Sequence, residues 1–102
     1  MDWNIKTGHG HLHPPDYSRV DGDGHVRFRY SNPENDNSSI DIFDFAMDRV
    51  IQLDNSHLVN NNESEIIWNG RNDYGDQVAN GVYFCRLSID GMYYWTKLAV
   101  VN

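Results

Sequence analysis

The feature that most constrains this chain is a predicted β-hairpin near its end. Asp90-Gly91 separates two runs of alternating apolar and polar residues, at 82–89 and 92–101, and this dipeptide is the strongest short-range hairpin signal that a sequence offers. A two-residue turn also fixes which residues pair across the hairpin. One nearly all-apolar face is therefore predicted to point inward, with the pairs Ile89 and Met92, Leu87 and Tyr94, Cys85 and Thr96, and Tyr83 and Leu98.

The opposite face of this hairpin is amphipathic and is predicted to point outward. Its cross-strand pairs combine aromatic rings with cationic side chains, which suits cation–π contacts. Exposed aromatic rings are a liability for an isolated domain, so we expect this face to meet a neighbouring domain or a partner protein. The candidate binding residues on it are Phe84, Arg86, Tyr93, Trp95 and Lys97.

Alternation with a period of two continues upstream of the hairpin and predicts further strands. Val26, Phe28 and Tyr30 alternate with charged or polar residues, as in a strand with one buried face. Further strands are predicted at residues 39–45, with Ile40 and Ile42 inward, at 49–53 and at 65–69. No long segment has the helical period, so the fold is predicted to be an all-β antiparallel sandwich of six to eight strands.

The first 24 residues differ from the rest and are predicted to form a linker or irregular arm, pinned at one end by Trp3 and Ile5; the domain itself is predicted over residues 25–102. The arm contains three candidate metal ligands, His9, His11 and His13. Asp16 or His25 could supply a further ligand and complete a metal site. Neighbouring glycines and prolines favour exposed linker residues instead, so no cofactor is expected. The run of residues 21–24 (Asp-Gly-Asp-Gly) is interpreted as an Asx turn, not as a calcium loop.

Composition and charge argue against several functions. The net charge of −7 opposes binding of nucleic acid, which requires a cationic face. No apolar run approaches the roughly 20 residues that span a bilayer. Cys85 lies on the inward face of the predicted hairpin, where a thiol is a poor nucleophile. The carboxylates of Asp41, Asp44, Glu63 and Glu65 are predicted to face solvent, so we expect no enzymatic activity.

The segment of residues 68–75 is predicted to be a structural loop that follows a strand. The large ring of Trp68 is suited to cap one end of a core, and the glycines of the segment mark tight turns. Its Asn and Asp side chains can accept hydrogen bonds from the backbone amides of the loop. It contains no nucleophile. Together with the hairpin residues that follow, the structural positions are Trp68, Gly70, Asp73, Gly75, Gly81, Tyr83, Asp90 and Gly91.

These residues resemble a known family. Trp68-Asn69-Gly70-Arg71, Gly75 and then Gly81-x-Tyr83-x-x-Arg86 are similar to the immunoglobulin-like domain of flagellar hook-capping proteins and to the related C-terminal modules of secreted proteins. The run of residues 40–44 resembles a strand of that family and Val50 the start of its next strand, although Met47-Asp48 stand where the family has glycine–arginine. Residues 96–102 look like the closing strand of type IX secretion sorting domains.

The resemblance implies an immunoglobulin-like fold and a function in secretion. The chain would be a non-catalytic C-terminal accessory module of a secreted or cell-surface bacterial protein. Its partner would be a neighbouring domain or the secretion and surface-attachment machinery, reached through an edge strand and the outer hairpin face. Two alternatives remain open at this point: a structural assembly module like that of the hook cap, and a carbohydrate-binding β-sandwich module.

Overall fold

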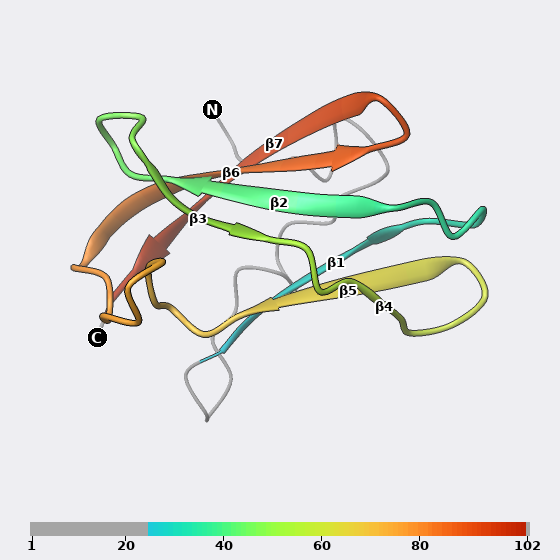
Figure 1. Cartoon of the computed structure of the whole chain (residues 1–102), viewed down its shortest axis with the longest axis horizontal. Helices are drawn as coiled ribbons and strands as arrows, with labels where there is room; N and C mark the ends of the chain where they lie inside the picture. The colour runs from blue at the N-terminus through green and yellow to red at the C-terminus, as the bar shows by residue number, and fades with distance from the viewer. Residues whose placement is uncertain (1–24, 102) are drawn as a thin grey trace.

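The computed structural model describes residues 25–101, which form two antiparallel sheets packed face to face (Figure 1). The predicted arm over residues 1–24, with the three-histidine run and the Asp-Gly repeat, lies outside the described residues, as does Asn102. The strands are β1 (Val26–Ser31), β2 (Ser38–Phe43), β3 (Arg49–Leu53), β4 (His57–Leu58), β5 (Glu63–Trp68), β6 (Gly81–Ile89) and β7 (Met92–Val100).

The two sheets have the strand orders β1-β5-β4 and β3-β2-β6-β7. The chain passes between them at each of the connections β1–β2, β3–β4 and β5–β6, whereas β2 and β3, β4 and β5, and β6 and β7 are successive strands of the same sheet (Figure 1). This is an immunoglobulin-like antiparallel β-sandwich. The predicted all-β fold is confirmed, with seven strands within the range that the sequence predicts.

The hairpin forms with the predicted register. Nine residue pairs join β6 and β7, from Ile89 and Met92 at the turn to Gly81 and Val100 at the open end. Asp90 and Gly91 both have positive φ, 50° and 73°, as a type I′ turn requires. The backbone twist of a type I′ turn matches the right-handed twist of the two strands. The residues of the turn therefore favour the same strand pairing that the structure shows.

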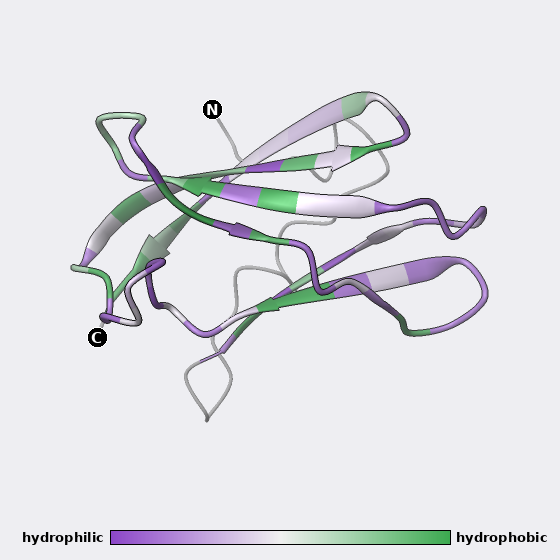
Figure 2. Cartoon of the chain, in the orientation of Figure 1, coloured by the Kyte–Doolittle hydropathy of each residue, from purple (hydrophilic) through white to green (hydrophobic). Residues whose placement is uncertain are grey.

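The core is built from the inward residues of both sheets, and the alternation of hydropathy along the strands is visible in Figure 2. Phe28, Tyr30, Ile66 and Trp68 come from one sheet and are fully buried. The other sheet contributes the buried residues Ile40, Ile42, Tyr83, Cys85, Leu87, Ile89, Leu98 and Val100. At about 25 cal/mol per Å² of apolar surface, burial of these side chains is the main stabilising contribution.

Some predicted details are wrong. β2 ends at Phe43 and not at residue 45, and the short strand β4 had no signal because it has only two exposed residues. At the turn of the hairpin, Met92 is exposed and Tyr94 is half-buried, although both were expected inside. Tyr94 still packs against the edge of the core.

The loop after β5 is ordered by its own polar side chains. The Trp68 ring is buried edge-to-face against Tyr83, with ring centroids 6.0 Å apart, and its Nε1 donates to the carbonyl of Arg71 at 2.9 Å. Asn72 Oδ1 accepts hydrogen bonds from the backbone amides of Tyr74 and Asp76. Asp73 takes part through its backbone amide, which donates to the Val50 carbonyl at 3.3 Å. The loop therefore caps one end of the core.

Candidate binding surface

The five predicted binding residues lie on the outer face of the four-stranded sheet. Cross-strand register makes this face a grid of three rows. Each row takes one residue from β2, one from β6 and one from β7, so its side chains project on the same side of the sheet. The rows are Ser39–Ser88–Tyr93, Asp41–Arg86–Trp95 and Phe43–Phe84–Lys97. We call these nine residues the outer face.

Arg86 is the centre of the outer face. Its guanidinium carbon lies 4.8 Å from the ring centroid of Tyr93, 5.4 Å from that of Phe43 and 5.7 Å from that of Trp95. Its Nη2 donates to Asp41 Oδ2 at 3.0 Å. The hydrogen bond to Asp41 fixes the guanidinium, and the cation–π contacts fix the rings beside it. The rings are therefore in place before any partner binds.

Two further aromatic rings join this surface, and the sequence analysis did not assign them to it. Phe43 lies 5.7 Å from Trp95, centroid to centroid, and Phe45 stacks on Phe84 at 6.0 Å. Phe45 is 74% exposed and Tyr93 is 62% exposed, whereas Trp95 is 40% exposed. The alternation along β2 already predicted that Phe43 lies on the other face of the sheet from Ile42. Only the pairing of β2 with β6 brings Phe43 next to the hairpin.

Asp41 was expected to face solvent, and this prediction is wrong, because its side chain is only 2% exposed. It does point outward, but Arg86 covers it on one side, and Arg49 Nη1 lies 3.5 Å from its Oδ1. A register shift between Ile42 and Phe43 places Arg49 there. Without this shift Arg49 would point to the same side of the sheet as Ile51, which is the side of the core.

Glu65 is a second buried carboxylate that was expected to be exposed. On the outer face of the three-stranded sheet, its two oxygens lie 3.2 Å from His57 Nε2, 3.3 Å from Arg29 Nη2 and 3.5 Å from Arg27 Nη1. The partners come from the strands on either side of β5, so the cluster joins all three strands. Asp44 and Glu63 are partly exposed.

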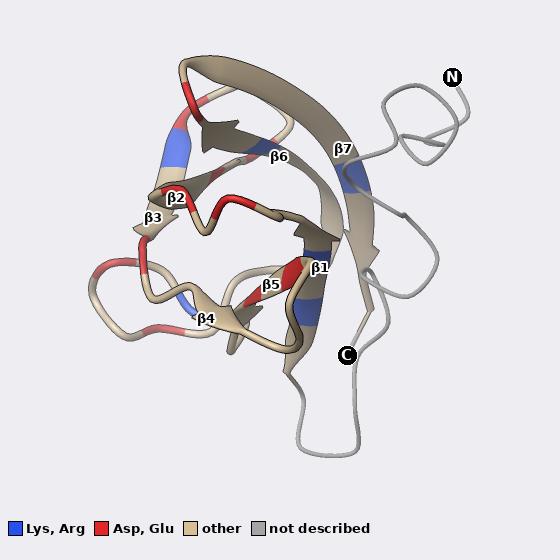
Figure 3. Ribbon diagram, turned by 90° about the vertical axis from the view of Figure 1, so that its right-hand side faces the viewer, with Lys and Arg blue, Asp and Glu red and all other residues tan. Residues whose placement is uncertain are grey.

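Acidic residues are concentrated in the loops, although β5 also carries them (Figure 3). Arg49, Arg86 and Lys97 lie on the strands of the four-stranded sheet, where Asp41 is the acid that neutralises part of their charge. Most of the described acids lie in turns and loops, among them Asp44, Asp48, Asp73, Asp76 and Asp90. The outer face is therefore basic and aromatic on a chain of net charge −7.

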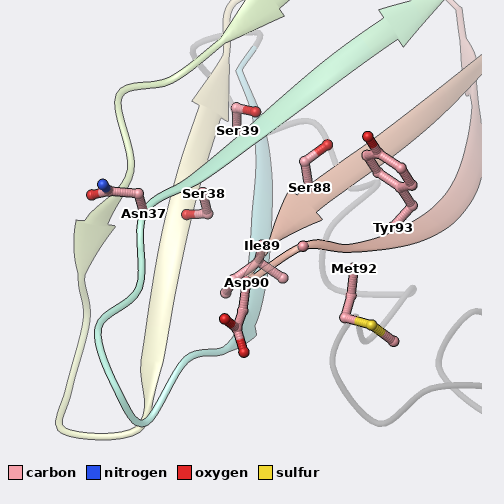
Figure 4. Close-up of a pocket in the computed structure, with 9 residues that line it drawn as sticks. Asn37, Ser38, Ser39, Ser88, Ile89, Asp90, Met92 and Tyr93 are labelled. Atoms are coloured by element: carbon pink, nitrogen blue, oxygen red, sulfur yellow. The ribbon is translucent and has the colours of Figure 1, made fainter.

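A solvent-open hollow of about 330 Å³ adjoins the outer face at the β6–β7 turn. Figure 4 shows the Ser88 hydroxyl beside the Tyr93 ring and Ser39 on β2, on the other side of Ser88. Ser39, Ser88 and Tyr93 are the first row of the grid, which explains why they lie on the same side. The lining residues are Asn37, Ser38, Ser39, Ser88, Ile89, Asp90, Gly91, Met92 and Tyr93.

The described residues present little reactive chemistry. Cys85 is buried, and desolvation raises the pKa of its thiol far above the ordinary value. Within residues 25–101 no group of three or more His, Cys, Asp or Glu side chains is placed to hold a metal ion. The same part of the chain has no helix long and apolar enough to cross a membrane. The histidines at positions 9, 11 and 13 lie outside this part.

Fold and surface together define a class: an immunoglobulin-like sandwich with a preorganised aromatic and basic sheet face. No family model matches the chain, and no curated protein matches its sequence. Two solved structures are similar to it in fold. One is PorZ, described as an essential bacterial surface component of the type IX secretion system of Porphyromonas gingivalis, with 21% identity, a TM-score of 0.57, and coverage of 89% of this chain and 11% of PorZ.

The other is dimeric latent PorU from Porphyromonas gingivalis, with 24% identity, a TM-score of 0.60, and coverage of 89% of this chain and 9% of PorU. This chain thus spans about a tenth of the length of either neighbour. At these identities the likeness is one of fold, and it agrees with the sandwich that the strand order gives.

Proposed function

We propose that this chain is a non-catalytic module of a secreted or cell-surface bacterial protein, and that the secretion or surface-attachment machinery recognises it through the outer face. The observation that carries the proposal is the set of rings held around Arg86. Tyr93, Trp95 and Phe45 keep much of their surface exposed although Arg86 or a neighbouring ring fixes their orientation.

Rigid, exposed aromatic side chains beside a cation are the residues that dominate protein interfaces, because they bury a large area at little cost in conformational entropy. β7 ends the strand order of its sheet, next to these rings. A partner strand added beside β7 would contribute backbone hydrogen bonds, while the rings of the outer face supply contact area and specificity.

The fold likeness to PorZ supports the secretion context, since PorZ is described as a surface component of a type IX secretion system. The resemblance of residues 68–86 and 96–102 to sorting domains points in the same direction. The buried thiol and the ion-paired state of Asp41 and Glu65 support the non-catalytic part of the proposal.

The test is a fusion of the full chain behind a reporter enzyme in a bacterium with type IX secretion. We expect the reporter at the cell surface or in the medium, and at least a tenfold loss of export for Trp95→Ser, a change of hot-spot size. Tyr74→Ser is the matched control, because Tyr74 is 89% exposed but lies in the loop after β5. Retention of the unmodified fusion in the periplasm would refute the proposal.

A further inference from the structure

We propose that the hollow at the β6–β7 turn, together with the Tyr93 ring, is a binding site for a neutral saccharide. The site shares the outer face with the proposed function but does not depend on it, because sugar binding and export are separate measurements. It uses the first row of the grid, whereas the export test above uses Trp95 in the second row.

The Tyr93 ring supplies a stacking platform. One side of it rests on the Arg86 guanidinium, whose central carbon is 4.8 Å from the ring centroid, and yet the residue is 62% exposed. A ring that is held in place and open to solvent provides a flat apolar surface at little entropic cost. The C–H face of a sugar ring matches this surface, because it is flat and apolar while the hydroxyls project from its rim.

The hollow supplies the polar half of the site. Ser88 lies directly beside Tyr93 in the same row, Ser39 is the next residue of that row on β2, and each serine is half-buried. A serine hydroxyl both donates and accepts, which is what a sugar hydroxyl requires of its partner. Asn37 and Asp90 add an amide and a carboxylate to the lining. A volume of about 330 Å³ is at the lower end of the range for ligand sites.

Charge indicates that the saccharide is neutral. The positive charge of Arg86 is already paired with Asp41 at 3.0 Å, and Lys97 is four residues beyond Tyr93, which is about 13 Å along a strand. Asp90 is the charged residue among those that line the hollow, and the chain carries −7 overall. An anionic polymer would be repelled here, whereas a neutral, hydroxyl-rich ligand meets matching groups.

The experiment applies the labelled full chain, displayed in many copies on beads, to an array of neutral and acidic glycans, because multivalent display on both sides detects the weak single-site binding expected of an open hollow. We expect capture by neutral glycans. Titration with the best of them should then show about tenfold weaker binding for Tyr93→Ala. For Ser39→Ala/Ser88→Ala we expect a loss of about fivefold per hydrogen bond.

Two further variants keep the result interpretable. Tyr74→Ala removes a more exposed ring that lies in the loop after β5 and does not line the hollow, and this variant should bind as the unmodified chain does. Tyr93→Phe keeps the ring and should retain most of the binding even if Tyr93→Ala folds poorly. Two array results overturn the site: no capture by any neutral glycan, or capture of acidic glycans alone that added salt abolishes. The site is also overturned if the serine variant binds as tightly as Tyr93→Phe, because removal of the serine hydroxyls would then have no effect.

Discussion

The turn between β2 and β3 shows how single residues shape this molecule. Asp44 closes the turn, because its Oδ1 accepts hydrogen bonds from the backbone amides of Ala46 and Asp48 at 2.9 and 3.0 Å. This closure requires Met47 to adopt a φ of 66°, in the left-handed region that a side chain with a Cβ resists. Met47 stands where the resembling family has glycine, so the chain keeps the turn at an energetic cost.

We therefore expect Met47→Gly to stabilise the protein. Glycine enters the left-handed region without the Cβ clash, and the gain should be about 0.5–1 kcal/mol after the greater entropy of glycine in the unfolded chain is subtracted. The free energy of unfolding is measured by urea denaturation. Ala46→Gly is the control, because Ala46 has no positive φ, and it should be destabilising. A Met47→Gly variant as unstable as this control would contradict the strained turn.

At the scale of the elements, each sheet is joined on its outer side by one buried carboxylate. Asp41 of β2 connects Arg49 of β3 with Arg86 of β6, and Glu65 of β5 connects β1 with β4. Backbone pairing alone leaves β4 with two residue pairs, so the 3.2 Å contact of His57 Nε2 with Glu65 adds an interaction that this short strand needs. The carboxylates are buried because long basic side chains cover them from both neighbouring strands.

Asp41→Asn tests the role of this carboxylate. The substitution keeps the shape of the side chain but leaves the half-buried Arg86 and the exposed Arg49 without their negative partner. We expect a loss of about 2 kcal/mol in the free energy of unfolding, and increased mobility of the rings around Arg86 in NMR relaxation. Asp48→Asn, at an exposed position in the β2–β3 turn, is the control and should change stability by less than about 0.5 kcal/mol. Equal effects of the two substitutions would refute the argument.

At the scale of the whole molecule, three titratable groups, Tyr30, Tyr83 and Cys85, are buried in the core between the two layers. Tyr30 of one sheet hydrogen-bonds the hydroxyl of Ser38 in the other, and Tyr83 donates to the Ala79 carbonyl at 2.6 Å. Burial raises the pKa of Tyr30 and of Cys85, and burial together with the nearby charge of Asp44 raises the pKa of Tyr83. All three groups are thus stabilised in their neutral form by the packing of one sheet on the other.

This predicts a loss of stability at alkaline pH. In the unfolded chain the thiol and phenols titrate near their ordinary values of 9.0 and 10.0, while the fold keeps them protonated to higher pH. Above about pH 9 the unfolded state therefore binds fewer protons, and stability falls by up to about 1.4 kcal/mol per pH unit for each group. Below this pH the contribution is complete and constant.

Urea denaturation between pH 7 and pH 11 measures this effect. In Cys85→Ala the decline should begin about one pH unit later than in the unmodified chain, because only the two tyrosines then remain. Comparing slopes removes the constant cost of the small cavity that this substitution leaves. A free energy of unfolding that stays flat to pH 11 would mean that these groups titrate alike in both states.

The sequence by itself determined the β-hairpin, its register, and the inward face of most strands, with Met92, Tyr94 and the short strand β4 as the exceptions. These are short-range properties: Asp90-Gly91 selects the turn, and a period of two assigns the faces over neighbouring residues. For the same reason it placed Phe84, Arg86, Tyr93, Trp95 and Lys97 together on one side of the hairpin.

Only the tertiary structure decided what lies beside that hairpin. Asp41 and Arg86 are 45 residues apart in the chain, and their contact depends on β2 choosing β6 as its neighbour. The same pairing buries Asp41, brings Phe43 to the rings and places Ser39 beside Ser88, while the register shift in β2 and β3 turns Arg49 outward. Pairing between distant strands is set by the packing of the whole core, which no local pattern encodes, and so the outer face and its hollow are properties of the folded chain.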